Sequence, residues 1–595
     1  MKGSPLRQYF HQYFSILGDS KSKLPLLLGF FLFSSLLDVV GIGMVGSFGA
    51  MLNSAATDDV QLPWGQAVVL FRQSSGENAM VAIGVAIVLT FYIKGVSAYW
   101  VRKRIVRFSM LQLSQLRQRL MRAYQTMHYH FYLSRNTAEL IQSINGHTTN
   151  FTSGTLMASL SLAAEAITVL FVVGLLLVVN AGAVAAVSLI IVFMLFIYYR
   201  IVRVRILAAG RACNLATREM IRGITEGMRG FKEIRVLGRE IFFCEMVKHN
   251  AERFAKETGQ YQGYQIIPRY LMESVLVTFI IGMCLAWEQD EVGAGQLMPM
   301  LGIFGVAALR LMPAANQMMM AVNQLRFSRH SMMRVYQDLR EIEKIGGSWQ
   351  ADGREAEREF NAPFSRLVLE NVWYTYAFAK SPSIRNLSLT VSRGETVGLI
   401  GKSGSGKTTL IDIILGFLVP QEGRVLVNGS ELTEHPRGWL NRVAYIPQMI
   451  FLTDDTLRNN IALGFDEEEI GEKWLEQVID LAQLREVVNQ LPEGINTLVG
   501  ENGIRLSGGQ RQRVALARAL YHEREVIIMD EATSALDQET EQAVTEAVHA
   551  LQGERTFIII AHRLTTLERC DVVYRLEEGR IVESASYAAV LGRNE

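Results

Sequence analysis

The order of apolar and polar positions divides the chain into two halves. Six apolar stretches in the N-terminal half are each long enough for the roughly 20 residues that cross a bilayer core. They lie near residues 24–52, 79–101, 154–179, 183–200, 266–287 and 295–324. From Arg366 onward the apolar positions come in short β-branched runs, which are typical of buried strands. The pattern predicts a six-helix membrane domain followed by a soluble α/β domain.

Two of the connections between these stretches are long and rich in arginine. They follow the second and fourth stretches, whereas the opposite connections carry acidic residues or no charge. Basic loops stay on the cytoplasmic side, so both termini are predicted to be cytosolic. The first apolar stretch is too long for a cleavable signal peptide and has no small-residue cleavage site. Few glycines or prolines interrupt the two basic connections, which predicts helical hairpins that continue out of the membrane toward the soluble domain.

Shorter segments complete the predicted organisation. An amphipathic helix from Leu6 to Leu17 has an aromatic face that would suit either the membrane interface or packing on protein. Gly227–Phe243, near the tip of the second hairpin, is interpreted as a short docking helix or as a plain amphipathic part of the hairpin. Residues 58–73 form an interfacial-looking outer segment. We expect a membrane domain over residues 1–340, a linker over 341–365 and the soluble α/β domain over 366–595.

A glycine-rich segment dominates the second half. A β-branched run leads into Gly401–Thr408, spaced G-x-x-x-x-G-K-T, and then into an apolar helical pattern. Backbone N–H groups of such a loop surround phosphate oxygens, and the helix N-terminus adds favourable dipole charge. Lys407 reaches the terminal phosphates and the Thr408 hydroxyl can ligate Mg²⁺. The predicted phosphate-binding residues are Gly401, Ser403, Gly404, Ser405, Gly406, Lys407, Thr408 and Thr409.

Further residues downstream suit ATP chemistry. The buried run 526–530 ends in Asp530, a predicted Mg²⁺ ligand, and Glu531 follows it as the candidate that polarises the attacking water. Gln448 and His562 each follow a strand pattern, so Gln448 could sense Mg²⁺ or water and His562 could contact the γ-phosphate. A lone Gln or His after a strand is more often an ordinary loop residue, which is the alternative interpretation for both. The run LSGGQ, at 506–510, leads into a helix and offers a second anion-binding helix start.

In their order along the chain, these motifs resemble those of the ATP-binding cassette (ABC) transporters, specifically exporter-type half-transporters. The segment TLVGENG at 497–503 and SALD at 534–537 belong to the same series. The resemblance implies that Tyr376 stacks on adenine and that Asp537 belongs to the ATP site. It also implies that Ser507, Gly508, Gly509 and Gln510 contact ATP held by a second identical subunit. With Mg²⁺ as cofactor, such a homodimer would have two competent ATP sites.

Ionisable residues within the membrane half indicate what kind of substrate the protein binds. Lys94, Arg269 and Arg310 fall at similar depth in three apolar stretches, where ionisable residues are costly and indicate function. A basic ring there would receive an anionic headgroup such as a pyrophosphate. The alternative is that these side chains extend to the inner surface, or that Glu273 neutralises Arg269 four residues away. Together with the outer segment and the run FKEIRVLGRE at 231–240, these positions resemble those of bacterial flippases for lipid-linked oligosaccharides used in protein glycosylation.

Composition excludes several other classes. The formal net charge of +1 gives no reason to expect a nucleic-acid partner, and the four cysteines lie too far apart for a zinc site or disulfide framework. The favoured function is ATP-driven movement of an anionic glycolipid from the inner to the outer leaflet of a bacterial cytoplasmic membrane. An exporter of another lipid, drug or peptide is the first alternative. An ATP-gated channel or regulator on the same frame is the second.

Overall fold

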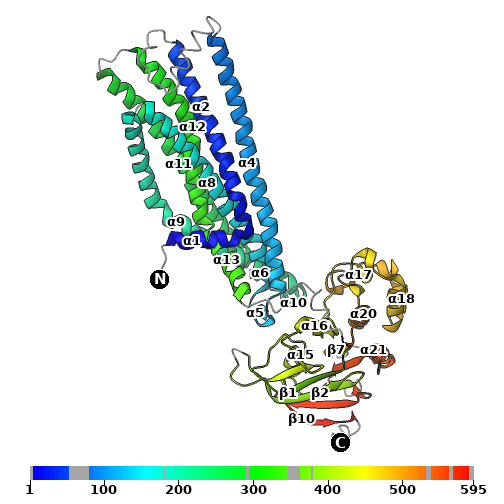
Figure 1. Cartoon of the computed structure of the whole chain (residues 1–595). Coiled ribbons are helices and arrows are strands. Elements are labelled where there is room, and N and C mark those ends of the chain that lie inside the picture. The colour runs from blue at the N-terminus through cyan, green and yellow to red at the C-terminus, as the bar shows by residue number, and fades with distance from the viewer. Residues whose placement is uncertain are drawn as a thin grey trace. The chain divides into compact units, whose positions relative to one another are not determined.

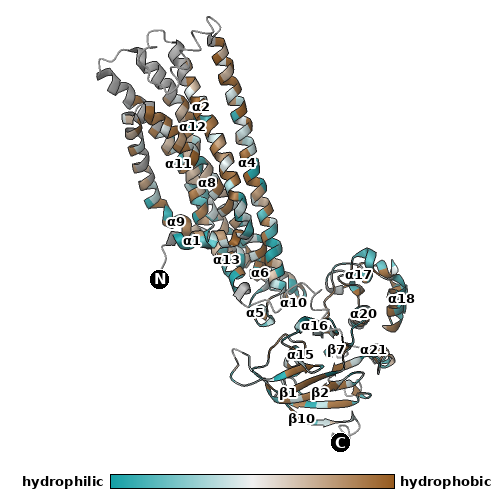
Figure 2. Ribbon diagram, viewed as in Figure 1, coloured by the Kyte–Doolittle hydropathy of each residue, from teal (hydrophilic) through white to brown (hydrophobic). Residues whose placement is uncertain are grey.

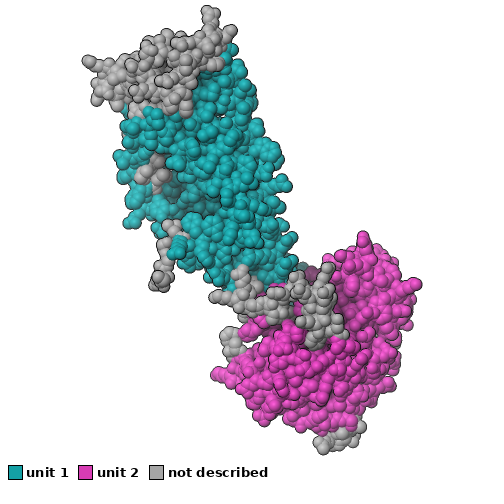
Figure 3. All heavy atoms as spheres, viewed as in Figure 1, with its two compact units in different colours: residues 1–125, 134–345 teal, residues 126–133, 346–595 magenta. Residues whose placement is uncertain are grey.

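The structure is a computed structural model that describes residues 5–52, 79–133, 135–179, 181–289, 294–344, 362–376, 379–530, 538–561 and 567–587. It has two compact units (Figure 3). One comprises residues 1–125 and 134–345, and the other comprises residues 126–133 and 346–595. The short segment 126–133, which sequence reasoning assigned to the membrane half, therefore belongs to the C-terminal unit.

The first unit is helical (Figure 1). Its longer helices are α1 (Pro5–Leu17), α2 (Leu24–Leu52), α4 (Ala79–Gln125), α8 (Met157–Val179), α9 (Ala181–Arg229), α11 (Glu240–Gln289), α12 (Ala294–Phe327) and α13 (Arg329–Lys344). Its short elements are η1 (Gly18–Lys23), α6 (Thr137–Gln142), η3 (Ser143–His147), α7 (Thr148–Phe151), η4 (Thr152–Leu156) and α10 (Phe231–Val236). Each of the six predicted apolar stretches lies on helix, and α13 continues to Lys344, four residues beyond the predicted end of the membrane domain.

The long connections are helical, as predicted. Helices α4, α9 and α11 are 47, 49 and 50 residues long, far more than a bilayer requires. Figure 2 shows mainly hydrophobic colouring along the upper part of α4 and more hydrophilic colouring at its lower end and around α13 and α6. Among the described residues, three helical stretches are long and apolar enough to cross a membrane: Arg7–Val45, Val81–Gln125 and Thr137–Val178.

Close helix packing holds this unit together. Helix α11 lies along α9, and α12 packs on α8 and α2. Tyr198, Ile206 and Tyr261 belong to one buried cluster between α9 and α11. A Cβ atom at Gly210 would lie 2.4 Å from the Phe327 carbonyl oxygen, so only glycine fits where α9 meets the end of α12. Helix α12 is continuous across Pro313, although proline lacks the backbone N–H that a helix interior uses.

The aromatic face of the N-terminal helix is partly packed on protein and partly exposed. Tyr13 is buried, and its hydroxyl lies 2.8 Å from the Ser159 Oγ. Phe10 and Phe14 on the same helix are exposed. Helix α1 therefore packs on the helices of its own unit and leaves two rings on the outside. The outer segment 58–73 and most of the predicted linker lie outside the described residues.

The second unit is an α/β domain, as the sequence predicted, and it contains two sheets. A six-stranded sheet has the order β10-β9-β3-β8-β7-β6, in which β9, β3, β8, β7 and β6 pair in parallel. Its strands are β3 (Thr396–Ile400), β6 (Val443–Ile446), β7 (Val526–Asp530), β8 (Thr556–Ile560), β9 (Val572–Glu577) and β10 (Arg580–Ala585). An antiparallel sheet of order β2-β1-β4-β5 contains β1 (Arg366–Tyr374), β2 (Ile384–Ser392), β4 (Glu422–Val427) and β5 (Ser430–Glu431).

Helices fill the remainder of the second unit. They are α5 (Tyr129–Leu133), α15 (Lys407–Ile414), α16 (Pro436–Leu440), α17 (Leu457–Ile461), α18 (Glu472–Leu481), α19 (Arg485–Gln490), α20 (Gly508–Tyr521) and α21 (Gln538–Ala550), with short 3₁₀ turns at 467–469, 494–496 and 501–503. One buried cluster joins α15 to both sheets through Leu410, Ile413 and Val397. This core fixes the loop before α15 against the end of β3.

Candidate ATP site and intramembrane charge cluster

The parallel sheet brings the predicted ATP residues to one edge. Strand β3 lies next to β8, β8 next to β7, and β7 next to β6. Parallel strands end at the same edge, which places Gly401, Ala561, Asp530 and the loop that carries Gln448 side by side. Four segments far apart in the sequence therefore meet where a phosphate-binding loop opens into its helix.

The loop from Gly401 to Gly406 adopts a conformation that depends on glycine. Gly404 and Gly406 have φ angles of 81° and 105°, and a Cβ at Gly406 would lie 2.7 Å from the Ser383 carbonyl oxygen. The Lys407 Nζ donates to the carbonyl oxygens of Gly401 at 2.8 Å and Lys402 at 3.2 Å. The Lys407 ammonium group thus lies within the loop.

Polar groups in this loop fit a phosphate ligand. The Ser405 Oγ is buried and has no hydrogen-bond partner among the described residues, which is costly unless a ligand or water supplies one. Thr408 and Thr409 occupy the first turn of α15, where backbone N–H groups have no partner within the helix. Gly401 and Ser403 belong to the same loop. The donor set is that of a nucleotide-phosphate cradle.

Acidic residues beside the cradle suit a hard divalent cation. Asp530, at the end of β7, is only 8% exposed and accepts a hydrogen bond of 3.2 Å from the Tyr445 hydroxyl. Burial, with a smaller contribution from Asp530, raises the pKa of Asp412 in α15 to about 6. A carboxylate and the Thr408 hydroxyl are oxygen ligands of the kind that Mg²⁺ uses beside substrate phosphates. Glu531, Asp537 and His562 lie outside the described residues.

Tyr376 lies beside the cradle. Its hydroxyl is 3.3 Å from the Thr409 Oγ1, and its ring packs edge-to-face on Tyr374 with centroids 5.1 Å apart. The structure thus places an aromatic ring next to the helix that follows the loop. Its stacking on adenine remains a prediction.

The LSGGQ segment forms the start of α20. Ser507 is the N-cap: its Oγ accepts from the Gln510 N–H at 3.2 Å, while the Gln510 side chain accepts from the Ser507 N–H at 2.8 Å. This reciprocal cap satisfies two helix-terminal donors and leaves Ser507 exposed. Gly508 and Gly509 follow in the first turn. The helix start is therefore ordered and accessible, as binding to a second subunit's ATP would require.

Sequence reasoning missed Tyr129, at the tip of the first hairpin. Its ring lies 5.2 Å from the Phe417 ring, just after α15, and stacks on Tyr132 at 6.2 Å. The aromatic run at 129–132 within a polar connection was the available signal. Tyr129 packs against the same core that supports the phosphate loop.

The structure corrects the predicted basic ring in the membrane unit. Lys94 Nζ lies 2.6 Å from Asp38 Oδ1, and Arg310 Nε lies 3.0 Å from Asp38 Oδ2. Asp38 is 1% exposed, and Glu165 adds a second carboxylate 3.6 Å from Arg310 Nη1. Two cations therefore face two anions, and the cluster carries no net charge. We refer to these four residues as the intramembrane charge cluster.

Arg269 is not part of this cluster. It pairs with Glu273, four residues along α11, at 3.0 Å, and its side chain is 70% exposed. The structure therefore supports the alternative interpretation, in which Glu273 neutralises Arg269. Asp38 and Glu165 could have been noted in the sequence, because both fall within predicted membrane spans. Only the fold shows that Asp38 lies between Lys94 and Arg310.

Comparison with known families agrees with this architecture. The model of the ABC transporter transmembrane region matches residues 26–305, and the ABC transporter model matches residues 384–534. The chain belongs to the ABC transporter family. The first match runs from α2 into α12 of the membrane unit, and the second contains the cradle, Asp530 and the LSGGQ segment. A membrane region followed by an ABC cassette is the arrangement expected of an exporter half-transporter.

Individual relatives of this ABC transporter have related names. A protein named ATP-dependent lipid A-core flippase from Cupriavidus pinatubonensis is 43% identical over 38% of this chain and 39% of the relative. A protein of the same name from Salmonella typhimurium is 41% identical over 40% of this chain and 41% of the relative. The match thus spans about two fifths of the length of these relatives. A third protein of this name, from Methylobacillus flagellatus, is 28% identical over 84% of this chain and 83% of the relative.

A solved structure has the same fold. The ATP-bound structure of a bacterial Atm1-family ABC exporter aligns with a TM-score of 0.73, covering 94% of this chain and 96% of the other. The identity is 22%, so this likeness concerns the fold.

Proposed function

We propose that this chain is one half of an ATP-driven lipid flippase, which hydrolyses ATP as a homodimer and moves an amphipathic anion across the membrane. The observation that carries the proposal is the meeting of Lys407, Thr408 and Asp530 at one sheet edge, in a chain whose other unit has helices that can cross a bilayer. Relatives named as lipid A-core flippases support a lipid as the cargo.

The chain's own residues have distinct proposed roles in hydrolysis. Bound Mg–ATP supplies the reactive phosphoanhydride bond. Lys407 and the loop N–H groups hold the phosphates, and Thr408, Asp530 and Gln448 hold Mg²⁺ or its water. Glu531 accepts a proton from the attacking water, and His562 contacts the γ-phosphate. Ser507, Gly508, Gly509 and Gln510 would complete the partner's site.

The finer substrate proposal is a lipid-linked oligosaccharide with a pyrophosphate group. A polar headgroup crosses a bilayer slowly without a protein path, so such a lipid needs a transporter to reach the outer leaflet. We place the chain in a bacterial cytoplasmic membrane with both termini and the cassette in the cytosol, because arginine is concentrated in the connections at 102–153 and 201–265. Export of another lipid, drug or peptide is the alternative.

Reconstitution tests the proposal. The full-length protein is placed in liposomes that contain a panel of candidate lipids, and ATPase activity and lipid movement are measured together. A polyprenyl diphosphate oligosaccharide should stimulate ATPase activity and should become accessible at the opposite leaflet only when ATP is present. Stimulation by another lipid class alone would reject the finer substrate. ATP-dependent ion conductance without lipid movement would favour the channel alternative.

A further inference from the structure

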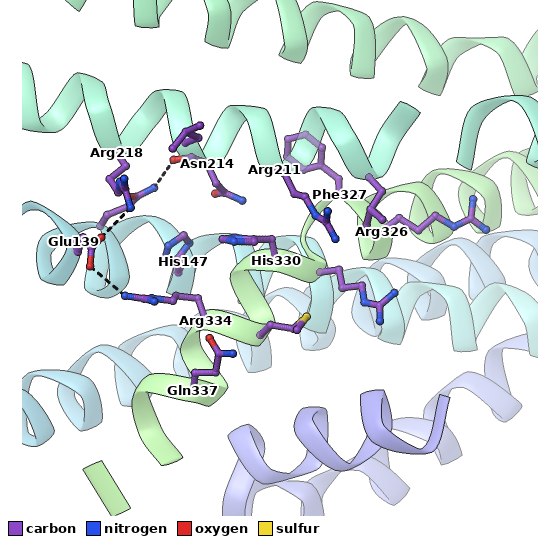
Figure 4. A pocket seen from close by; sticks show the side chains of 15 residues that line it. Glu139, His147, Arg211, Asn214, Arg218, Arg326, Phe327, His330, Arg334 and Gln337 are labelled. Carbon is purple, nitrogen blue, oxygen red and sulfur yellow. Dashed lines mark hydrogen bonds and ion pairs between the residues drawn. The ribbon is translucent and has the colours of Figure 1, made fainter. Parts of the chain in front are cut away.

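The membrane unit contains a cavity of about 600 Å³ outside the intramembrane charge cluster (Figure 4). Side chains from α6, η3, α9, the end of α12 and α13 line it. Its most frequent lining residue is arginine, which occurs at Arg211, Arg218, Arg326, Arg329 and Arg334. A cavity that gathers arginines from three helices is suited to a negatively charged ligand.

Acidic residues balance only part of this charge. Glu139 is the one acidic side chain among the described residues that line the cavity, and it pairs with Arg218 at 2.9 Å and Arg334 at 3.3 Å. Outside the lining, Glu219 pairs with Arg218 at 3.0 Å and Asp338 with Arg334 at 3.6 Å, so both of these arginines are neutralised. Figure 4 shows both guanidinium groups reaching Glu139. Arg211, Arg326 and Arg329 have no ion pair with any described residue. The cavity therefore has a surplus of positive charge, in contrast to the neutral intramembrane charge cluster.

Two histidines line the cavity without adding to the charge. The His147 and His330 rings lie 6.0 Å apart. Burial lowers the pKa of His330, and the positive charges of Arg211 and Arg334 lower it further. His330 is therefore neutral near pH 7, where it can donate one hydrogen bond and accept another.

The position of the cavity makes it reachable from the membrane surface. Arg326 follows the predicted span 295–324 by two residues, and its guanidinium carbon lies 4.3 Å from the centre of the Tyr199 ring, at the end of the predicted span 183–200. Arg211 lies 12 residues beyond Tyr199 on α9, a distance of about 18 Å at about 1.5 Å per residue. The arginines thus extend from the predicted inner surface of the membrane toward the cytosol.

We propose that this cavity binds a phosphate or diphosphate group. Guanidinium groups match phosphate oxygens with paired donors, and three of them here have no competing carboxylate. The inference rests on the proposed function in one respect: a diphosphate on the substrate lipid would bind here before it crosses the membrane. A soluble phosphate compound has the same chemistry and is the other source of the ligand.

Chemical modification of arginine locates the ligand directly. Full-length protein in phosphatidylcholine nanodiscs is treated with phenylglyoxal, and modification is measured at each arginine by peptide mass spectrometry. One arm adds inorganic pyrophosphate and the other uses nanodiscs that contain a polyprenyl diphosphate lipid. Reading individual peptides separates this cavity from the phosphate loop, which also binds pyrophosphate. Arg253 on α11 is exposed, does not line the cavity and serves as the control.

Protection of Arg211, Arg326 and Arg329, with no change at Arg253, is the expected result. Protection by the lipid alone would identify a membrane-borne headgroup, and protection by pyrophosphate alone would identify a soluble anion. No protection in either arm, or equal protection of Arg253, would overturn the proposal. In the double variant Arg211→Gln/Arg326→Gln, half-protection of Arg329 should need at least about tenfold more ligand, a loss of about 1.4 kcal/mol. The variant Arg253→Gln should match wild type.

Lipid movement, measured on the same preparations, separates this inference from the proposed function. If the cavity arginines are protected but no lipid moves, the binding site stands and the flippase proposal fails. If lipid moves at the wild-type rate in the double variant and no arginine is protected, the flippase proposal stands and the cavity assignment fails.

Discussion

Lys94 Nζ lies 2.6 Å from Asp38 Oδ1, and the same carboxylate accepts Arg310 on its other oxygen at 3.0 Å. One aspartate on α2 therefore links α4 to α12. Without this carboxylate, removal of Lys94 and Arg310 should relieve a charge penalty and preserve stability. With it, the same change leaves Asp38 buried and unpaired.

The double variant Lys94→Gln/Arg310→Gln should therefore be destabilised, by about 3–5 kcal/mol, the usual consequence of removing one side of a buried ion pair. Adding Asp38→Asn and Glu165→Gln removes the carboxylates that have lost their cationic partners, and it should restore much of the lost stability. Thermal unfolding in detergent measures both effects. Arg269→Gln, at an exposed pair, should stay near the wild-type melting temperature. Wild-type stability of the double variant would show that Asp38 does not depend on these cations.

Glu531→Gln should trap an ATP-bound dimer. The Mg²⁺ and phosphate contacts remain while the attacking water loses its base, so ATP hydrolysis should fall by about 10² to 10⁴. ATPase assays, together with measurement of retained nucleotide, check this. ATPase activity close to wild type would remove Glu531 from the proposed role.

Mixing two inactive chains tests whether the exposed Ser507 serves a partner. Ser507→Arg blocks the LSGGQ segment, and Lys407→Ala weakens the phosphate loop. A dimer with one chain of each kind keeps one intact site, because both defects fall in the other site. ATPase activity should appear only on mixing. Full activity of Ser507→Arg alone would exclude the contact.

The pH dependence of stability should change in Asp412→Asn. Asp412 faces Asp530 and Tyr445 and contributes to raised pKa values of Tyr129 and Tyr374. Its own pKa is raised to about 6, so its stabilising contribution is complete below pH 4 and is lost as the pH rises through about 6.

At pH 8 without nucleotide, Asp412→Asn should therefore be more stable than wild type, by about 1 kcal/mol after allowance for solvent screening. The two proteins should converge near pH 4. Melting temperatures at the two pH values provide the measurement, with Asp480→Asn, an exposed carboxylate, as the control. A constant difference across this pH range would mean that the Asp412 charge is not responsible.

Local patterns predicted the cassette better than the membrane unit. The cradle, Asp530 and the start of α20 depend on short segments whose chemistry can be read from consecutive residues. The role of Lys94 and Arg310 depends on which residue of α2 faces them, and helix packing decides this. Arg269 differs because its partner lies one helical turn away, within reach of a sequence pattern. The arginine cavity combines residues from α9, α12 and α13 that no single stretch shows together.

The placement of Tyr129 on Phe417 has a practical consequence for work on the cassette. A protein expressed from residue 346 onward would lack residues 126–133, which the compact C-terminal unit includes. The Phe417 ring would then face water, and α15 would lose a neighbour close to the phosphate loop. Nucleotide affinities measured on such a fragment would be those of a C-terminal unit without residues 126–133. Supplying a peptide that contains Tyr129 in trans would show how much of the fragment's behaviour comes from that omission.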